Sequence, residues 1–177
     1  MTSLMSLPAA ASFSLPASRP LHTAWVLWSH LPDDRDFSDA SYTHLALFRT
    51  VEDVVCLMSQ LPAKLVENCM FFVMRQGIKP QWEDTLNREG GYFSYKVNNG
   101  SVLSNWKDLV YATLGETLCA DKDVMAHVTG ITISPKRNFC ILKIWMQTCH
   151  YQNPRVITAR MSLVQSQTSL FQKHKIM

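Results

Sequence analysis

The sequence of 177 residues predicts an α+β fold built on an antiparallel sheet. Three observations lead to this prediction. Short apolar segments rich in strand-forming residues follow one another along the chain. Two longer segments repeat their apolar residues at helical spacing. Neither an internal repeat nor a low-complexity linker interrupts the series, so about three helices are expected to pack on one face of a single sheet.

The first predicted elements are two strands and a helix. Strands are expected at 24–28 (AWVLW) and 43–48 (THLALF), with a polar, turn-rich segment between them. Residues 50–61 predict an amphipathic helix whose shared face carries Val51, Val54, Val55, Met58 and Leu61. Thr50 is placed to cap this helix, and Asp53 stands where a capping box requires an acceptor.

The second half of the chain repeats this alternation. The remaining strands are predicted at 69–74, 92–97, 126–134, 139–148 and near Leu170. A second helix is expected over 104–119, and its shared face carries Trp106, Leu109, Val110, Thr113 and Leu114. Asn153 and Pro154 are expected to open a third helix, because proline is favoured at the first helical position.

Composition narrows the possible functions. Lysine and arginine exceed aspartate and glutamate by 17 to 14, a net charge of +3 that permits a phosphate-bearing ligand without requiring one. No stretch approaches the roughly 20 apolar residues of a membrane-spanning helix, so no membrane partner is expected. Residues 1–20 lack a basic region before their apolar run, which favours a disordered tail over a secretory signal.

The five cysteines are scattered, without a CxxC pair or histidines at metal-ligand spacing. They are interpreted as reduced thiols of a cytoplasmic protein, mostly in the core, and neither metal nor cofactor is expected. An enzyme would need a nucleophile beside a base, and only Cys119 with His127 and Cys149 with His150 are close in sequence. Neither pair lies in a recognisable motif, so the sequence favours a binding module over an enzyme.

One loop places an aromatic residue and a carboxylate where water is expected. Residues 76–91 (QGIKPQWEDTLNREGG) join two predicted strands and carry Trp82 beside Glu83 among loop-forming residues. A one-sided sheet leaves its other face open, and a loop tryptophan there could meet a flat ligand. Alternatively, Trp82 packs as a lid on the core and Glu83 is solvated.

Several motifs keep the order and approximate spacing of a known family from residue 20 to the end. They are Trp25–Trp28, Phe48–Asp53, Gly77–Asp84, Gly90–Gly91, Leu114–Glu116 and Ile144–Trp145. The chain resembles the eukaryotic translation initiation factor 4E family, which binds the 7-methylguanosine cap of messenger RNA. The resemblance implies one cap-binding domain over 21–177, a curved sheet of about eight strands and about three helices on its convex face.

The resemblance assigns roles around the cap. Trp82 would stack on the methylated guanine, whose positive charge adds about 0.5–2 kcal/mol of cation–π attraction. Glu83 would accept hydrogen bonds from the guanine N1 and N2 groups, and Trp145 would contact the N7-methyl group. The family's second stacking tryptophan falls at Ser38 in this chain, so the second ring is assigned to Phe37, with Tyr42 as the alternative; Phe37 could instead anchor the loop, and Trp145 could be core.

The phosphate-binding residues are assigned less directly. The family has basic residues before the strand of Trp145, which implies Lys136, Arg137 and Lys143 in this chain. After Gly91 the family commonly has a basic residue, whereas this chain has Tyr92, which is assigned to the cap-binding residues. Near the C-terminus, the contacts implied for the family's last loop fall on Lys173, His174 and Lys175.

The resemblance also implies a helix from a scaffold or repressor protein bound on the convex face. The residues assigned to that contact are Pro20, Val51, Val55, Lys107, Tyr111 and Leu114. Val55 replaces a family tryptophan and Lys107 replaces an apolar residue, which predicts a different partner sequence. The expected function is cap binding and recruitment of mRNA for translation. The alternative is a divergent member with weak cap affinity that acts as a partner-binding or decoy subunit.

Overall fold

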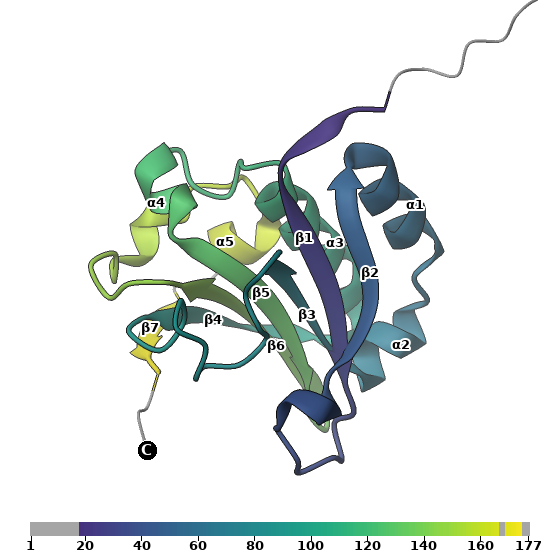
Figure 1. The fold of residues 1–177 in the computed structure, drawn as a ribbon. Helices are drawn as coiled ribbons and strands as arrows, with labels where there is room; N and C mark the ends of the chain where they lie inside the picture. Colours follow the sequence, from purple (N-terminus) through teal and green to yellow (C-terminus); the bar gives the residue numbers. More distant parts are fainter. Residues whose placement is uncertain (1–17, 167–168, 175–177) are drawn as a thin grey trace, which may run out of the picture.

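A computed structural model describes residues 18–166 and 169–174. Its centre is a seven-stranded antiparallel sheet (Figure 1), which confirms the predicted fold class but has one strand fewer than expected. The strands are β1 (Pro20–His30), β2 (Thr43–Thr50), β3 (Met70–Arg75), β4 (Gly91–Asn98), β5 (Val128–Pro135), β6 (Phe139–Met146) and β7 (Leu170–Lys173). They lie in the order β2-β1-β3-β5-β6-β4-β7, so β2 and β7 form the edges.

The described residues contain more helices than predicted. The α-helices are α1 (Val51–Gln60), α2 (Ala63–Asn68), α3 (Val102–Leu114), α4 (Lys122–Ala126) and α5 (Ser162–Ser166). Three short 3-10 helices are η1 (Asp39–Ser41), η2 (Asn99–Ser101) and η3 (Pro154–Val156). In Figure 1, α3 lies behind the sheet, with α1 and α2 to the right and α4 to the upper left.

The capping box predicted for α1 is present. The Asp53 amide donates to Thr50 Oγ1 over 3.2 Å, and the Thr50 amide donates to Asp53 Oδ2 over 2.9 Å. These bonds satisfy amides that have no partner within the helix. Val54 and Met58 face the core as predicted, whereas Val55 is 48% exposed and points outward.

Two helix predictions were wrong in extent. The second helix begins at Val102 and ends at Leu114, because Glu116 takes a φ of +55° and the Thr117 amide turns back to the Ala112 carbonyl over 2.9 Å. No α-helix begins at Asn153. Its side-chain oxygen instead accepts the Arg155 amide over 3.0 Å, and this cap holds only the short η3.

Alternation along the strands divides the apolar side chains between two faces. On β3, Phe71 and Val73 join the main core beneath the helices, while Phe72 and Met74 join a smaller cluster on the opposite face. The main core also contains Trp25 and Trp106, both fully buried. The smaller cluster lies on the face that the helices leave open.

The predicted tail lies outside the described residues except for 18–20. Within that short part, the backbone amide and side chain of Arg19 bond Glu52, and Pro20 begins β1. The described part of the chain contains no helix long and apolar enough to cross a membrane.

The cysteines are free thiols, but fewer of them are in the core than predicted. Cys119 and Cys140 are buried, whereas Cys69 and Cys149 are partly exposed and Cys56 is exposed. In the described ranges, no group of three or more histidine, cysteine, aspartate or glutamate side chains is placed to hold a metal ion.

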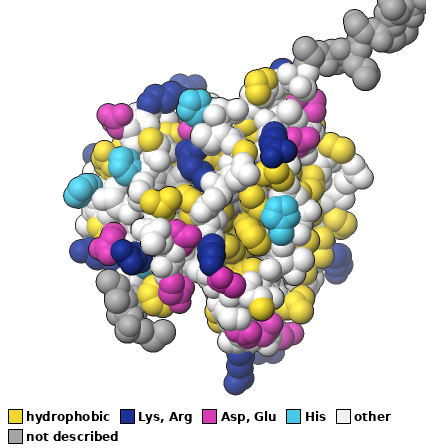
Figure 2. All heavy atoms as spheres, in the orientation of Figure 1, with side chains coloured by type: hydrophobic (Ala, Val, Ile, Leu, Met, Phe, Trp, Pro, Cys, Tyr) yellow, Lys and Arg dark blue, Asp and Glu magenta, His cyan; other side chains and the backbone are white. Residues whose placement is uncertain are grey.

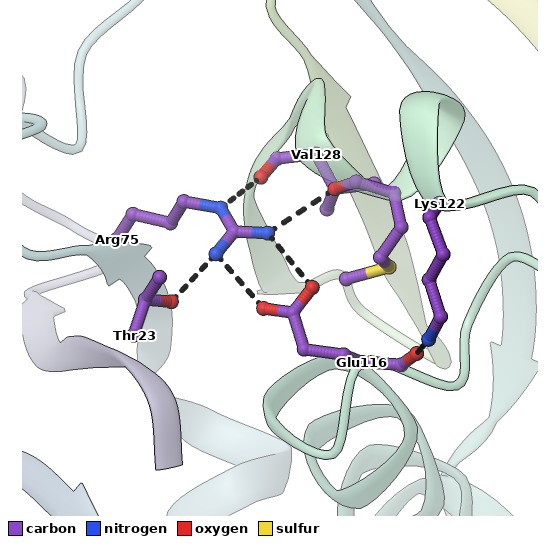
Figure 3. A network of polar contacts seen from close by, with 6 residues as sticks. Thr23, Arg75, Glu116, Lys122 and Val128 are labelled. Atoms are coloured by element: carbon purple, nitrogen blue, oxygen red, sulfur yellow. Dashed lines mark hydrogen bonds and ion pairs between the residues drawn. The ribbon is translucent and has the colours of Figure 1, made fainter.

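Arg75 ties four segments together at the end of β3 (Figure 3). Its guanidinium donates to the Val128 carbonyl (2.7 Å), Thr23 Oγ1 (2.6 Å) and the Met125 carbonyl (3.1 Å). It also pairs with Glu116 over 2.9 Å, and each side chain of the pair is only 14% exposed. The network therefore fixes β1, α4, β5 and the segment after α3 relative to β3.

We predict that Arg75→Met lowers the free energy of unfolding by about 3 kcal/mol, because the largely buried Glu116 carboxylate loses its partner. Urea denaturation followed by circular dichroism measures the change. Arg155→Met is the matched control, since Arg155 is exposed. A loss no larger than that of the control would show that the network contributes little to stability.

Candidate functional site

A cavity of about 780 Å³ opens on the uncovered face of the sheet. It is lined by the β1–β2 loop, by the loop of residues 76–90, by side chains of β3 to β6, and by β7. Figure 2 shows the surface hollowed at its lower edge, with acidic and basic side chains on both sides. The cavity thus collects side chains from segments that are far apart in the sequence.

The 76–90 loop, which carries Trp82, is held by its own side chains. Asn87 is fully buried, and its amide group donates to the Lys79 carbonyl (3.1 Å) and the Gln81 carbonyl (2.7 Å). The Lys79 amide in turn donates to Asp84 Oδ2 over 2.9 Å. Trp82 is therefore carried on an ordered loop, half-buried at the cavity wall rather than sealed over the main core.

Glu83 and Trp145 line the same cavity as Trp82. Glu83 is exposed, whereas Trp145 is 6% exposed and meets Phe72 edge to face at 6.4 Å between ring centroids. The Trp145 indole N–H is buried without a hydrogen-bond partner among the described residues. Trp145 therefore belongs both to the small open-face cluster and to the cavity wall.

Both candidates for the second ring line the cavity. Phe37 stacks on the buried His30, with centroids 4.5 Å apart and planes 3° from parallel, and it remains 53% exposed. Tyr42 packs edge to face against Phe72 at 5.5 Å. Burial raises the pKa of Tyr42 to about 12, and the carboxylates of Glu83 and Asp39 add to the rise.

Tyr92 and Lys143 form a polar end of the cavity. Lys143 Nζ lies 4.1 Å above the Tyr92 ring, and the Tyr92 hydroxyl donates to Gln172 Oε1 over 2.6 Å. Burial, and secondarily Lys136, lowers the pKa of Lys143. Among the described residues, no carboxylate forms an ion pair with Lys143. This end of the cavity can therefore accept a negative charge.

His174 closes the polar end beside Trp145 and Tyr92, with ring centroids 4.9 Å and 5.5 Å away. Burial lowers the pKa of His174 to about 4, and the charge of Lys143 contributes. The imidazole is consequently neutral at pH 7. Its Nε2 atom is buried and has no partner within the described residues.

The predicted phosphate-binding residues fall into two groups. Lys143, Lys173 and His174 line the cavity. Lys136 borders the turn between β5 and β6 together with Arg137; both side chains are exposed and lie outside the cavity wall. Lys175 lies outside the described residues.

Gly90 and Gly91 are required by close backbone contacts. A Cβ atom on Gly90 would lie 1.8 Å from the Met146 carbonyl oxygen, and one on Gly91 would lie 2.3 Å from the Gln172 carbonyl oxygen. Glycine is the residue that permits such approach. The pair thereby lets β4 enter the sheet between β6 and β7, next to Tyr92.

The residues predicted for a partner surface differ in how far they are exposed. Pro20, Val51 and Leu114 line a separate hollow of about 630 Å³ that also contains Arg75 and Glu116. Leu114 is only 2% exposed and belongs to the main core.

The other three predicted partner residues lie at the surface of α1 and α3. Val55 is 48% exposed and Tyr111 is 40% exposed, while Lys107 is partly buried. The helical face therefore presents apolar and cationic side chains to solvent.

Several cavity residues were not predicted from the sequence. Gln81, Thr132 and Gln172 line the wall. The position of Thr132 is predictable from the sequence, because Thr132 stands between Ile131 and Ile133, which face the main core. The alternation of a strand places such a threonine on the opposite face.

Comparison with known proteins agrees with this architecture. The protein family described as Eukaryotic initiation factor 4E matches residues 20–176. Eukaryotic translation initiation factor 4E-2 of Schizosaccharomyces pombe is 31% identical over 143 residues, covering 75% of this chain and 56% of that protein. Eukaryotic translation initiation factor 4E of Homo sapiens is 27% identical over 145 residues, covering 78% and 64%. The chain thus spans about 56–64% of the length of these relatives.

Solved structures share the fold. Ascaris suum eIF4E-3, determined in complex with the m7G cap, superposes with a TM-score of 0.67 at 24% identity, covering 77% of each chain. C. elegans eIF4E-3, determined in complex with the 4E-binding protein Mextli, gives a TM-score of 0.65 at 23% identity, covering 75% of this chain and 77% of that one.

The depressed pKa of His174 predicts a pH-dependent stability. The unfolded chain binds this proton near the ordinary pKa of 6.5, whereas the folded protein binds it only near 4. Stability from this group is therefore complete above pH 6.5 and falls as the pH drops toward 4. After allowance for partial solvent exposure, wild type should lose about 1 kcal/mol more than His174→Gln between pH 7 and pH 5. Urea denaturation at the two pH values measures this difference.

The exposed His150 provides the matched control. His150→Gln should keep the wild-type pH dependence. If His174→Gln also keeps it, the imidazole does not titrate as its burial requires.

Proposed function

The chain belongs to the eukaryotic initiation factor 4E family, and on that premise we propose that it binds the 7-methylguanosine cap of mRNA in the open-face cavity. The bound mRNA would then reach the translation machinery through a scaffold or repressor protein docked on the helical face. We treat residues 21–177 as the cap-binding domain. We propose that this function is carried out in the cytoplasm, because mRNA is translated there.

One observation carries the proposal. A single cavity brings together Trp82, Glu83 and Trp145 with a further aromatic ring, Phe37 or Tyr42. A methylated guanine is flat, cationic and rich in N–H donors on one edge. It matches a cavity that has aromatic walls and an exposed carboxylate on its rim.

The energies favour a cationic base over an ordinary one. Stacking on an aromatic side chain contributes about 1–3 kcal/mol per base. The positive charge of the methylated ring adds about 0.5–2 kcal/mol when it lies over an indole. Glu83, as a charged acceptor, adds about 1.5–3 kcal/mol if it receives the guanine N1 and N2 protons. Adenine lacks that pair of donors.

The polar end suits the phosphate chain. Lys143 has no carboxylate partner among the described residues and lies at the cavity wall with Lys173. His174 is neutral at pH 7, so it offers a hydrogen bond rather than a charge. Lys136 and Arg137 would act from outside the cavity, as exposed charges that salt screens.

The structural neighbours support both halves of the proposal. The Ascaris protein was determined with the m7G cap, and the C. elegans protein with a 4E-binding protein. We propose the same two kinds of partner for this chain. The exposed Val55, Tyr111 and the neighbouring Lys107 would contact the protein partner.

We propose no catalysis. Burial raises the pKa of the Cys119 thiol to about 12, with further increases from Asp121 and Glu116. Such a thiol is protonated at neutral pH and is a poor nucleophile. Cys149 Sγ is engaged with the Glu89 and Gly90 carbonyls at 3.4 Å each.

The second candidate function is a partner-binding or decoy subunit with weak cap affinity. Two observations favour it: Tyr92 stands where the family has a basic residue, and Phe37 already has one face covered by His30. Retention on a 7-methylguanosine resin, with competition by 7-methyl-GTP and by GTP, separates the two functions. Retention that only the methylated nucleotide abolishes supports cap binding.

We predict that Trp82→Ala weakens binding of 7-methyl-GTP by at least about 30-fold, because stacking and cation–π attraction are lost together. Isothermal titration calorimetry measures the affinity. Leu86→Ala in the same exposed loop is the control and should bind as wild type. If Trp82→Ala unfolds the protein, the side chain is a lid on the core instead.

Glu83→Gln should cost about 1–3 kcal/mol of binding free energy, since an amide donor would then face the guanine N–H groups. Glu89→Gln removes a neighbouring exposed carboxylate and serves as control. Isothermal titration calorimetry with 7-methyl-GTP measures the affinity of both variants. Equal affinity of Glu83→Gln and wild type would exclude Glu83 from base recognition.

A further inference from the structure

Two loops that line the cavity are joined directly. Lys79 Nζ, in the 76–90 loop, forms an ion pair with Asp39 Oδ2 in η1 of the β1–β2 loop. Gln81 Nε2 donates to the Phe37 carbonyl over 2.8 Å. Both contacts join residues at least 40 positions apart in the sequence. We call these two contacts the loop bridge.

Each of the two loops is also fixed internally. In the β1–β2 loop, Asp36 accepts the Ser38 amide (2.8 Å) and hydroxyl (2.9 Å), and its carbonyl bonds His30 Nε2 over 2.7 Å. Phe37 stacks on that same histidine. In the 76–90 loop, the buried Asn87 side chain donates hydrogen bonds to two backbone carbonyls and so fixes the loop. Because each loop is fixed internally, the loop bridge acts on the distance between the two loops.

Charge makes this spacing depend on Lys79. The carboxylates of Asp39 and Glu83 come from opposite loops, and both lie close enough to Tyr42 to raise its pKa. Without Lys79, these like charges on different loops would repel each other, weakly because both side chains are exposed to solvent. Lys79 offsets the charge of Asp39, and its own pKa is raised, chiefly by the hydrogen bond to Asp39 and then by the charge of that carboxylate.

Resting on the function proposed above, we propose that Asp39 and Lys79 are positioning residues: they hold the Phe37–Tyr42 wall and the Trp82 wall at the separation that one flat base requires. Neither residue needs to touch the ligand. These residues would strengthen binding by pre-organisation. When the two loops already have the bound spacing, less conformational entropy is lost as the ligand binds.

The bridge is expected to matter for binding more than for folding. Both side chains are more than half exposed, and exposed ion pairs contribute little to stability. Variants at these positions should therefore fold normally. This separates a positioning role from a structural one.

The experiment is a charge swap. Asp39→Lys and Lys79→Asp each place like charges across the bridge, whereas the double variant restores an opposite pair and keeps the wild-type net charge. Affinity for 7-methyl-GTP, and for the phosphate-free nucleoside 7-methylguanosine, is measured by quenching of tryptophan fluorescence. Each single variant should bind about three- to tenfold more weakly, and the double variant should return to within about twofold of wild type.

Matched controls change the same charges in the same loops without touching the bridge. Asp33→Lys and Arg88→Asp alter exposed residues of the β1–β2 loop and the 76–90 loop. Both should bind the nucleoside within about twofold of wild type. The nucleoside matters because it removes any direct effect of the new charges on phosphates. Thermal unfolding midpoints confirm that all variants are folded.

A second readout needs no ligand. Hydrogen–deuterium exchange of the free protein should show faster exchange in residues 31–42 and 76–90 in each single variant, and wild-type exchange in the double variant. Single variants that bind and exchange like wild type overturn the proposal. So do single variants whose defects the double variant does not repair.

Failure of the proposed function gives a different pattern. In that case, wild type would not bind either methylated ligand, while the exchange data would still report whether the bridge sets the loop spacing. Rescue of exchange without any ligand binding would retain the bridge as a structural device and reject its role in recognition.

Discussion

The structure depends on one constraint, which is that successive side chains of a strand point to opposite faces of the sheet. Helices cover one face only, so each strand divides its residues between a sealed core and an open cavity. On β6, Ile144 is fully buried in the main core, while Lys143 and Trp145 line the cavity. A shift of the strand by one residue would exchange these sets, and the cost of burying Lys143 holds the register.

Among the described residues, polar groups buried without a hydrogen-bond partner occur on both faces of the sheet, among them the indole N–H groups of Trp25 and Trp106 in the main core. On the helical side, Arg75 is satisfied by carbonyls, a hydroxyl and Glu116. On the open side, the Trp145 indole N–H, the Thr132 hydroxyl and His174 Nε2 are buried without partners in the described part of the chain. Buried polar groups are nearly always hydrogen-bonded, so unpaired groups gathered around one cavity indicate a place for a polar ligand or ordered water.

Two positions in or beside the cavity differ from the pattern that the family resemblance implies. Ser38, where the family has a stacking tryptophan, helps to fix the turn through its bonds to Asp36, and the aromatic rings stand beside it at Phe37 and Tyr42. Tyr92 brings no charge to β4, but Lys143 on the neighbouring β6 places its ammonium over the Tyr92 ring. The cavity thus keeps an aromatic wall and a cationic end.

The sequence by itself determined the fold class, the strands from β1 to β7, the capped start of α1 and the loop that presents Trp82. These are local properties, because periodicity, capping and turn residues act over a few positions. It did not determine where α3 ends, since Gly115 and the positive φ of Glu116 belong to a turn held by the ion pair with Arg75.

Only the tertiary structure decided which charges share a site. Lys136 and Lys143 are close in sequence, yet one is exposed in a turn and the other lines the cavity. Lys79 meets Asp39, and His174 meets Trp145, only because the sheet order brings distant segments together. The pairing of the strands decides which side chains are buried and which distant residues touch. Local sequence patterns do not specify that pairing.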